Sequence, residues 1–392
     1  MTSGVIRTVA SPSSEIRCDG VATLLVEHRP RLQSACVFIQ LQESVKESVK
    51  LSVKPTEIIL KLPEKTLRIV LDNFTLNTHS LTSMIAAGKH ISFRINTNSE
   101  QFREEIISVN PSGGTQLTIP VHLKSGRSYG LLCSNCKAFL VARGSIYLRR
   151  VLELPSESAD SSDWFCHKPS SSGNCDILTP KLDEIFYGNF FFTINRGSVA
   201  NVRERNGLVY CQRCLQLLGR LLDESRVRVW NECVLFTTER HEEMNLMPNI
   251  SQMTNFRTII RKILLDFTMA GQCGLAHFQK IAFNCHLPEG SVCYLLLQIV
   301  DKKLDVYRSQ SSPGSDCLQL GRGTAMKVMY QSGEEAQVPQ IGQWLGDANV
   351  TQTEISCKML QSALNSLAEN AQILPQVYRS SCGFQVSYLF CD

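Results

Sequence analysis

Two pairs of cysteines in this chain have the spacing of metal ligands. Cys133 and Cys136 lie in the segment "LCSNCK", and Cys211 and Cys214 lie in "YCQRCL". Apolar residues flank both pairs, which is typical of a knuckle, a turn between two strands that presents two thiolates to one ion. Zinc favours four tetrahedral thiolates, and two knuckles supply four. The sequence therefore predicts one structural zinc ion held by these four cysteines.

Two other interpretations of the cysteine pairs stay open. A Cys-x-x-Cys motif can be a redox pair, but a thioredoxin-like site needs a junction from strand to helix, and no clear helix follows either pair. The two pairs can also be unrelated thiols, because 74 residues separate Cys136 from Cys211, more than compact zinc modules use. A shared site has to be assembled by the fold, with the intervening segment leaving it.

A second candidate for metal chemistry is the segment "DWFCHKP", where Trp164, Phe165, Cys166 and His167 are adjacent. The four knuckle cysteines can complete a zinc site by themselves, so Cys166 is left over. A thiolate is a preferred zinc ligand, and a catalytic zinc keeps one position open. We therefore predict an arm whose Cys166 thiolate fills the open position of a metal in another protein and displaces its nucleophilic water. The two aromatic side chains would anchor this arm.

Two alternatives for this segment also stay open. Cys166, His167 and Cys175 could bind a second metal within the chain, although adjacent residues are awkward ligands for one ion. Alternatively, Trp164 and Phe165 pack on the protein itself and Cys166 is incidental.

Strands are expected to position most of these residues. The first 150 residues contain short runs of β-branched and aliphatic residues separated by Pro, Gly and Asn, which favour a sandwich or a partly open barrel. A polar segment from Pro155 to about Pro180 predicts a long, functional loop. The strand pattern returns in "EIFYGNFFFTIN".

The last third of the chain mixes helices and strands. Apolar spacing predicts one helix over 254–271 and another over 351–372, with Thr351 or Thr353 near the cap of the second. A hairpin is expected around Asp301-Lys302-Lys303, and the ending "GFQVSYLFCD" predicts a strand. The apolar surroundings of four further cysteines suggest small core residues. These are Cys36, Cys233, Cys293 and Cys357.

The predicted fold class is α+β and rich in strands. We expect an antiparallel β domain at the N-terminus, zinc knuckles joined by a long loop, and a mixed α+β domain at the C-terminus. The predicted segments are 1–150 with the first knuckle, 151–182 as the functional loop, 183–240 with the second knuckle, and 241–392 as the α+β domain.

Composition narrows the classes of function. The 392 residues carry 40 basic and 36 acidic side chains, a net charge of +4, which argues against a dedicated nucleic-acid binder. There is no apolar run of signal-peptide length and none of 18 residues, so we expect no membrane association, free thiols, and a cytoplasmic and nuclear location. Gly-x-Ser-x-Gly and His-Glu-x-x-His motifs are absent from the sequence, which disfavours a hydrolase.

The order of these features resembles one family. The chain resembles the HECT-like ubiquitin-protein ligases, which bind ubiquitin-conjugating enzymes. The resemblance is carried, in this order, by the strand-rich N-terminal half, the first cysteine pair, the segment "VLELPSESADSSDWFCH", the second pair and the ending "FQVSYL". The resemblance runs from about residue 20 to the C-terminal strand. It implies binding of a ubiquitin-conjugating enzyme and of ubiquitin, with transfer of ubiquitin to proteins that include the ligase itself.

The same resemblance implies roles for particular residues. It implies a link to pre-mRNA 3′-end processing through a metallo-β-lactamase-type endonuclease, whose metal centre Cys166 would engage with Trp164, Phe165 and His167 as neighbours. It also implies that the four knuckle cysteines bind zinc. The contact with the conjugating enzyme is expected after the second pair, in "RVRVWNECVLFTTERHEEMN", residues 226–245.

The catalytic residue of a ligase is not assigned by this resemblance. A HECT ligase has a catalytic cysteine near its C-terminus in a Leu-Pro…Thr-Cys context, and this chain offers Leu374-Pro375…Ser381-Cys382. Serine replaces threonine, the spacing differs and no large N-lobe precedes it, so Cys382 is a weak candidate for a thioester-forming nucleophile. The alternative function is a non-enzymatic binding protein, an assembly chaperone or inhibitor of the metallonuclease.

Overall fold

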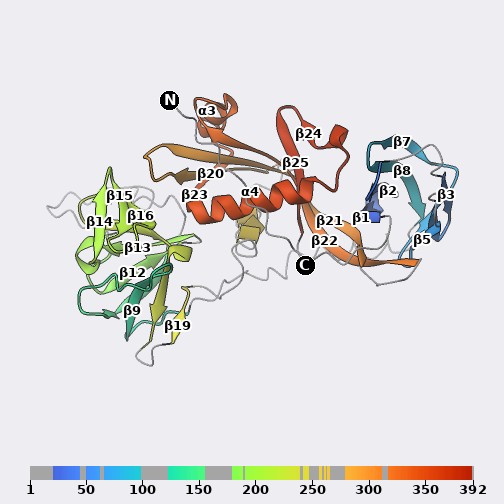
Figure 1. Ribbon diagram of the computed structural model, residues 1–392. Coiled ribbons are helices and arrows are strands. Elements are labelled where there is room, and N and C mark those ends of the chain that lie inside the picture. Colours follow the sequence, from blue (N-terminus) through green and yellow to red (C-terminus); the bar gives the residue numbers. More distant parts are fainter. Residues whose placement is uncertain are drawn as a thin grey trace.

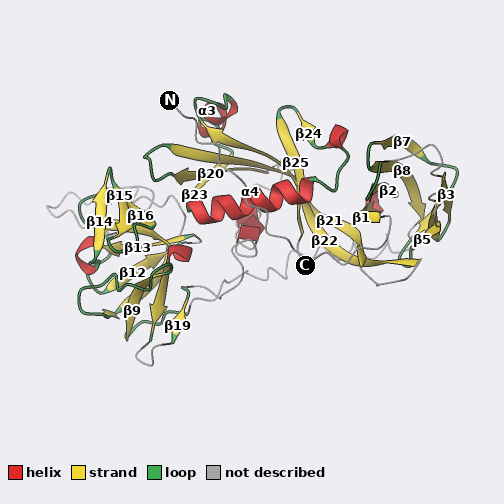
Figure 2. Ribbon diagram, in the orientation of Figure 1, coloured by secondary structure: helices red, strands yellow, loops and turns green. Residues whose placement is uncertain are grey.

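A computed structural model of the chain shows an N-terminal body of strands, a central part and a further body of strands along one axis, with helix α4 (Cys357–Ala371) at the centre (Figure 1). Strands greatly outnumber helices throughout the described residues (Figure 2). The structure describes residues 21–44, 50–61, 66–98, 122–154, 179–188, 190–238, 242–246, 256–257, 260–261, 263–264, 279–310 and 317–390.

The N-terminal body consists of the first eight strands and the far ends of two later ones, β21 and β22. Its sheet has the order β3-β4-β5-β22-β21-β1-β2-β8-β6, with β7 paired to β8. Alternating apolar residues point inward, as Leu67 and Ile69 do in β5, and they build one apolar core. The strands are β1 (Val21–Arg29), β2 (Ser34–Leu41), β3 (Lys50–Lys54), β4 (Glu57–Lys61), β5 (Thr66–Val70), β6 (Thr75–Leu76), β7 (Thr82–Ala87) and β8 (His90–Asn98).

A long antiparallel ribbon of β21 (Val292–Gln310) and β22 (Cys317–Glu334) connects the N-terminal body to the centre of the molecule (Figure 1). The predicted hairpin around Asp301-Lys302-Lys303 is wrong. These residues form an irregularity inside β21, where the pairing with β22 shifts on both sides of Asp301. A bulge exposes consecutive polar residues just as a turn does, which explains the error.

The four-cysteine body contains two sheets, shown on the left of Figure 1. The seven-stranded sheet has the order β11-β12-β13-β17-β16-β15-β14, and the four-stranded sheet has the order β10-β9-β18-β19. Aromatic rings join them, since Phe192 of the first sheet lies 5.5 Å from Phe236 of the second. The strands are β9 (Arg127–Cys133), β10 (Ile146–Leu148), β11 (Arg150–Glu153), β12 (Glu184–Tyr187), β13 (Phe191–Asn195), β14 (Val202–Arg205), β15 (Leu208–Cys211), β16 (Leu217–Leu221), β17 (Arg226–Trp230), β18 (Val234–Thr237) and β19 (Glu243–Met244).

The central part places helix α4 (Cys357–Ala371) across the strands of the C-terminal region. Ser387 in the last strand donates to the Leu367 carbonyl oxygen at 2.6 Å, which fixes the helix on that strand. The other elements are β20 (Gln279–His286), α3 (Gln340–Leu345), β23 (Val350–Glu354), β24 (Ser380–Ser381) and β25 (Phe384–Phe390). The final strand is confirmed as predicted, and the described residues between 256 and 264 are helical.

The predicted cap of α4 is wrong. Thr351 and Thr353 belong to β23, which pairs in parallel with β20, and the helix begins shortly after that strand ends. Ser356 is the N-cap, because its hydroxyl accepts a hydrogen bond from the Met359 backbone N–H at 3.1 Å. Threonines near the end of a strand can therefore be mistaken in sequence for the N-cap of the helix that follows.

The strand-rich α+β class is confirmed. The division of the chain into four segments stays a prediction, and strand pairing links parts that lie far apart in sequence. Strand β9 pairs with β18, and β1 pairs with β21. Among the described residues, no helix combines the length and apolar character needed to span a membrane.

Candidate metal centre

The first knuckle is a tight turn at the end of β9. The Cys133 backbone N–H donates to the Ala138 carbonyl oxygen at 2.9 Å, and the Lys137 N–H donates to the Cys133 carbonyl oxygen at the same distance. Lys137 adopts a left-handed conformation with φ of 59°. Together these bonds fold the chain back within six residues, so that both cysteine side chains leave the same side of the turn.

The second knuckle repeats this geometry at the end of β15. The Cys211 N–H donates to the Gln216 carbonyl oxygen, and the Leu215 N–H donates to the Cys211 carbonyl oxygen, each at 2.9 Å. Leu215 occupies the position of Lys137, with φ of 58°. A left-handed conformation is uncommon for residues other than glycine, and its presence at equivalent positions marks two copies of one turn.

Gly219 brings the second knuckle close to its supporting strand. A Cβ atom at this position would lie 1.9 Å from the Arg228 carbonyl oxygen of β17, so only glycine fits. The close approach of β16 to β17 holds the turn that precedes β16, and with it Cys214.

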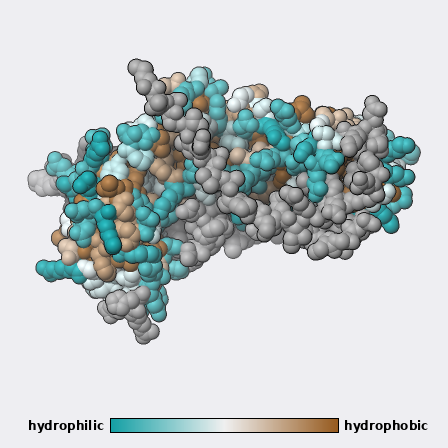
Figure 3. All heavy atoms as spheres, viewed as in Figure 1, coloured by the Kyte–Doolittle hydropathy of each residue, from teal (hydrophilic) through white to brown (hydrophobic). Residues whose placement is uncertain are grey.

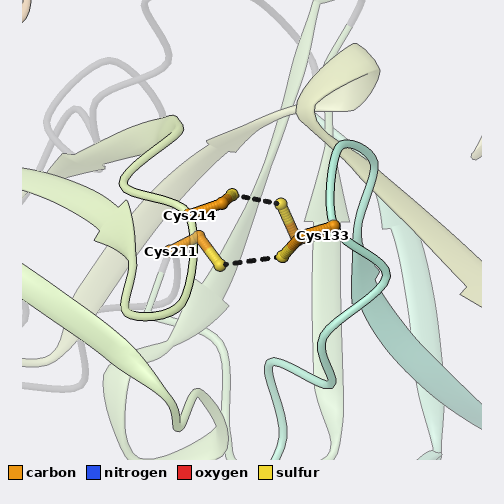
Figure 4. A group of neighbouring side chains, drawn as sticks. Cys133, Cys211 and Cys214 are labelled. Atoms are coloured by element: carbon orange, nitrogen blue, oxygen red, sulfur yellow. Dashed lines mark hydrogen bonds between the residues drawn. The ribbon is translucent and has the colours of Figure 1, made fainter.

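The two knuckles face each other and bring four sulfur atoms together (Figure 4). The Sγ atoms lie within 4.8 Å of one another, and the Cys133–Cys214 and Cys136–Cys211 distances are both 3.6 Å. In a tetrahedron with zinc–sulfur bonds of about 2.3 Å, sulfur atoms are about 3.8 Å apart. The four cysteines therefore fit one tetrahedral ion, and the fold assembles the predicted ligand set.

The electrostatics of this cluster favour a bound cation. Burial raises the pKa of Cys133 to about 12, and it also raises the pKa of Cys211. Burial acts on Cys214 in the same direction, but hydrogen bonds from the Gln216 backbone N–H and the neighbouring Cys136 thiol outweigh it and lower the Cys214 pKa to about 6. Four thiolates cannot share one small buried volume without a compensating positive charge, which a divalent ion supplies.

Side chains around the cluster link the two turns. The Gln216 amide nitrogen donates to the Ser134 hydroxyl at 3.2 Å and to the Cys233 carbonyl oxygen at 3.3 Å, and its amide oxygen lies 3.7 Å from the Cys133 sulfur. The Arg213 guanidinium donates to the Cys136 carbonyl oxygen at 3.4 Å. Sequence reasoning missed Gln216, although its place two residues after the second pair is a usable signal.

The other predicted site residues have different outcomes. Trp164, Phe165, Cys166, His167 and Cys175 lie outside the described residues.

Cys382, by contrast, is described and exposed. It occupies the turn between β24 and β25, where Cys382 and Gly383 both have positive φ angles. Its sulfur accepts a hydrogen bond from the Ser381 hydroxyl at 3.9 Å.

The described residues of the segment 226–245 expose little apolar surface. Val227, Val229 and Trp230 in β17, together with Val234 and Phe236 in β18, are all buried in the core. Exposed apolar side chains lie beside the knuckles instead, where Phe139 is 43% and Leu215 is 55% exposed. Apolar surface is visible over the four-cysteine body in Figure 3.

Comparison with known proteins relates the chain to one family. The family model described as HECT-like ubiquitin-conjugating enzyme (E2)-binding matches residues 27–386. Proteins named as E3 ubiquitin-protein ligases are 24% identical in Rattus norvegicus, over 94% of this chain and 97% of the relative, and 22% identical in Homo sapiens, over 93% and 97%. No solved structure gives a significant match. Since the family model covers nearly the whole chain, this protein belongs to the HECT-like ubiquitin-conjugating enzyme (E2)-binding family.

Proposed function

We propose that this protein is a ubiquitin-protein ligase or a ligase-associated protein that binds a ubiquitin-conjugating enzyme and supports the transfer of ubiquitin. The family match over residues 27–386 carries this proposal, since binding of such an enzyme is the family's stated property. The names of the relatives point to the same reaction class. We place this activity in the cytoplasm and nucleus.

One structural zinc ion, in this proposal, is held by Cys133, Cys136, Cys211 and Cys214. Four thiolates fill the coordination sphere of zinc and leave no position for substrate or water. The ion would therefore act by cross-linking the two knuckles, and the residues beside them would be held in fixed positions.

We assign the docking surface for the conjugating enzyme to the two knuckles. Phe139 follows the first pair by three residues and Leu215 follows the second pair directly, and both are exposed. Asn201 links the two knuckle segments. Its side chain donates to the Phe139 carbonyl oxygen at 2.9 Å, and its backbone carbonyl oxygen accepts from the Gln212 N–H at 2.9 Å. Rigid, exposed apolar residues are suited to bind a partner at low entropic cost.

Affinity measurements against a panel of purified ubiquitin-conjugating enzymes test this assignment. Leu215→Asp and Phe139→Asp should each weaken binding at least about tenfold, which corresponds to about 1.4 kcal/mol. Leu32→Asp is the matched control, because Leu32 is also exposed but belongs to the N-terminal body. Binding that is lost equally in all three variants, or in none, would remove the knuckles as the docking surface.

The route of ubiquitin transfer is tested separately. If transfer is covalent through Cys382, a reducible ubiquitin adduct forms on the chain and disappears in Cys382→Ala. If the protein only positions the conjugating enzyme, no adduct forms and Cys382→Ala transfers ubiquitin at the parental rate. A persistent adduct in Cys382→Ala would exclude Cys382 as the nucleophile.

We further propose that the Trp164–His167 segment engages the metal centre of a metallo-β-lactamase-type endonuclease of pre-mRNA 3′-end processing. The alternative function is a non-enzymatic binding protein, an assembly chaperone or inhibitor of that nuclease. The support comes from the cysteine count: the knuckle cysteines form a complete set of four, which leaves Cys166 available for a metal in a partner. Cys166→Ala should weaken the complex with the nuclease, while Cys382→Ala should not. Unchanged affinity in Cys166→Ala would remove this role.

A further inference from the structure

A second group of cysteines lies outside the metal centre, at the start of helix α4. Cys357 is the first residue of this helix and Cys285 is the next-to-last residue of β20. Their sulfur atoms are 3.4 Å apart, although the two residues are separated by 72 positions in sequence. Cys293 lies directly opposite Cys285 in the neighbouring strand β21. The family assignment gives no role to these residues.

The two sulfur atoms differ in access and in acidity. Cys285 is completely buried, whereas Cys357 is only partly buried. The Cys285 thiol donates a hydrogen bond to the Cys357 sulfur, and this bond lowers the pKa of Cys357 against the opposing effect of burial, while it raises the pKa of Cys285. The N-terminus of a helix also favours negative charge on its first residue. Cys357 is therefore placed as the attacking thiolate and Cys285 as its partner.

The distance between the sulfurs allows them to bond. A disulfide has a sulfur–sulfur distance of about 2.05 Å, so the two atoms have to approach by about 1.4 Å for the bond to form. The Cys357 sulfur also lies 3.2 Å from the His286 carbonyl oxygen, which accepts its proton in the thiol form. In the thiol form this hydrogen bond keeps the Cys357 side chain next to Cys285, and it is lost when the thiolate forms.

The pair lies at the boundary between the central part and the four-cysteine body. Lys358 donates to the Ser134 hydroxyl of the first knuckle at 3.1 Å, and the Ser356 hydroxyl donates to the Glu232 carboxylate between β17 and β18. The residues on both sides of Cys357 thus contact the body that carries the metal centre. A covalent bond at Cys357 would fix the start of α4 to β20 at this boundary.

We propose that Cys357 and Cys285 form a redox-active dithiol that a hydroperoxide oxidises to a disulfide. The Cys357 thiolate attacks one oxygen of hydrogen peroxide, the O–O bond breaks, and a sulfenic acid forms with release of one water after protonation. The Cys285 sulfur then attacks the Cys357 sulfur, the S–O bond breaks and a second water leaves. Two thiols are oxidised and one peroxide is reduced, so atoms and electrons balance.

Peptide mapping of the full-length protein after treatment with equimolar hydrogen peroxide tests this proposal. We expect a cross-linked peptide pair that contains Cys285 and Cys357, with the loss of two free thiols per chain and full reversal by dithiothreitol. The Cys293→Ala variant should form the same bond. Oxidation that yields a Cys285–Cys293 bond, or none between Cys285 and Cys357, would overturn the proposal.

A trapping experiment separates the roles of the two cysteines. In Cys285→Ser, whose hydroxyl can still donate to the Cys357 sulfur but cannot form a disulfide, dimedone, a reagent specific for sulfenic acids, should label Cys357 after peroxide treatment. The exposed Cys382 provides the comparison, since exposure alone would make it the preferred site. Labelling of Cys382 in place of Cys357 would contradict activation by the helix N-terminus. Peptide mapping of the parent protein, which carries no substitution, still tests the disulfide if Cys285→Ser fails to fold.

Discussion

The N-terminal body and the four-cysteine body are both built from strands, but different forces hold them together. The N-terminal body has a continuous apolar core that contains no metal-ligand cluster among its described residues. The four-cysteine body has apolar sheets as well, yet its two cysteine turns also bring four sulfur atoms together. We therefore expect the first body to be stable through burial alone and the second to depend on the proposed zinc ion.

Removing one ligand should produce the largest effect. Cys211→Ala leaves only three cysteines in the cluster, so the zinc ion that we propose joins the knuckles should be lost. Structural zinc contributes on the order of 10 kcal/mol to small domains, so we expect a loss on the order of 5 kcal/mol or more in the free energy of unfolding of the four-cysteine body. Hydrogen exchange with mass spectrometry should show increased exchange in residues 127–237, with the N-terminal strands unchanged.

Cys233→Ala is the control for this experiment. Cys233 is equally buried and lies in the same body, but its sulfur is not one of the four. Its replacement should cost about 1 kcal/mol and keep the metal content at one ion per chain. If Cys211→Ala destabilises the protein no more than Cys233→Ala, the ion does not hold this body together.

The ligand set could be predicted from sequence, whereas its surroundings could not. A Cys-x-x-Cys turn carries its own geometry within six residues, so Cys133 and Cys211 could be recognised without knowledge of the fold. The contact between Cys285 and Cys357 has no local signal, because a strand and a helix 72 positions apart create it. The hairpin predicted around Asp301 was wrong because exposed polar residues occur in turns and in bulges alike, and only the pairing with β22 distinguishes the two.

Breaking the contact between the four-cysteine body and the centre should have the second largest effect. Glu354 in β23 is buried and binds Arg220 at 2.8 Å and Arg228 at 2.9 Å, both from the cysteine-bearing sheet. Glu354→Ala removes the carboxylate and leaves two partly buried cations close together, which should cost about 3 kcal/mol in a chemical unfolding experiment.

An exposed ion pair in the same sheet provides the matched control for Glu354. Glu204 pairs with Arg196 at 2.7 Å at the surface, so Glu204→Ala should cost less than about 1 kcal/mol. Equal losses in the two variants would mean that burial of the Glu354 pair is unimportant for joining the two parts.

Acid should act on the N-terminal body through His28. Burial against Phe74, whose ring lies 4.2 Å away, lowers the pKa of His28 from 6.5 to about 4. The unfolded chain therefore binds more protons than the folded chain between pH 6.5 and 4, and the free energy of unfolding falls as the pH falls through this window. This loss of stability is complete below a pH of about 4 and amounts to at most about 3 kcal/mol.

The His28→Phe variant isolates this contribution. Phenylalanine can keep the stacking on Phe74 but cannot bind a proton, so the variant should lose less stability than the parent between pH 6.5 and 4. Urea unfolding at several pH values, with hydrogen exchange in β1 and β2 as the readout for the N-terminal body, measures the difference in pH dependence between parent and variant. An identical pH dependence in parent and variant would exclude His28 as the acid-sensitive group of the N-terminal body.

Gln216 should show the smallest effect, and it tests whether the ion alone joins the two knuckles. Gln216→Ala removes hydrogen bonds to Ser134 and to the Cys233 carbonyl oxygen but keeps all four sulfur ligands. Because groups around a metal site orient its ligands, we expect metal affinity to fall about 10-fold and stability by about 1 kcal/mol. Competition with a chromophoric chelator measures the affinity, and the exposed Gln212→Ala serves as the control in the same turn. If both variants bind the metal as the parent does, the four thiolates are sufficient to join the knuckles, and the hydrogen bonds of Gln216 do not contribute to metal affinity.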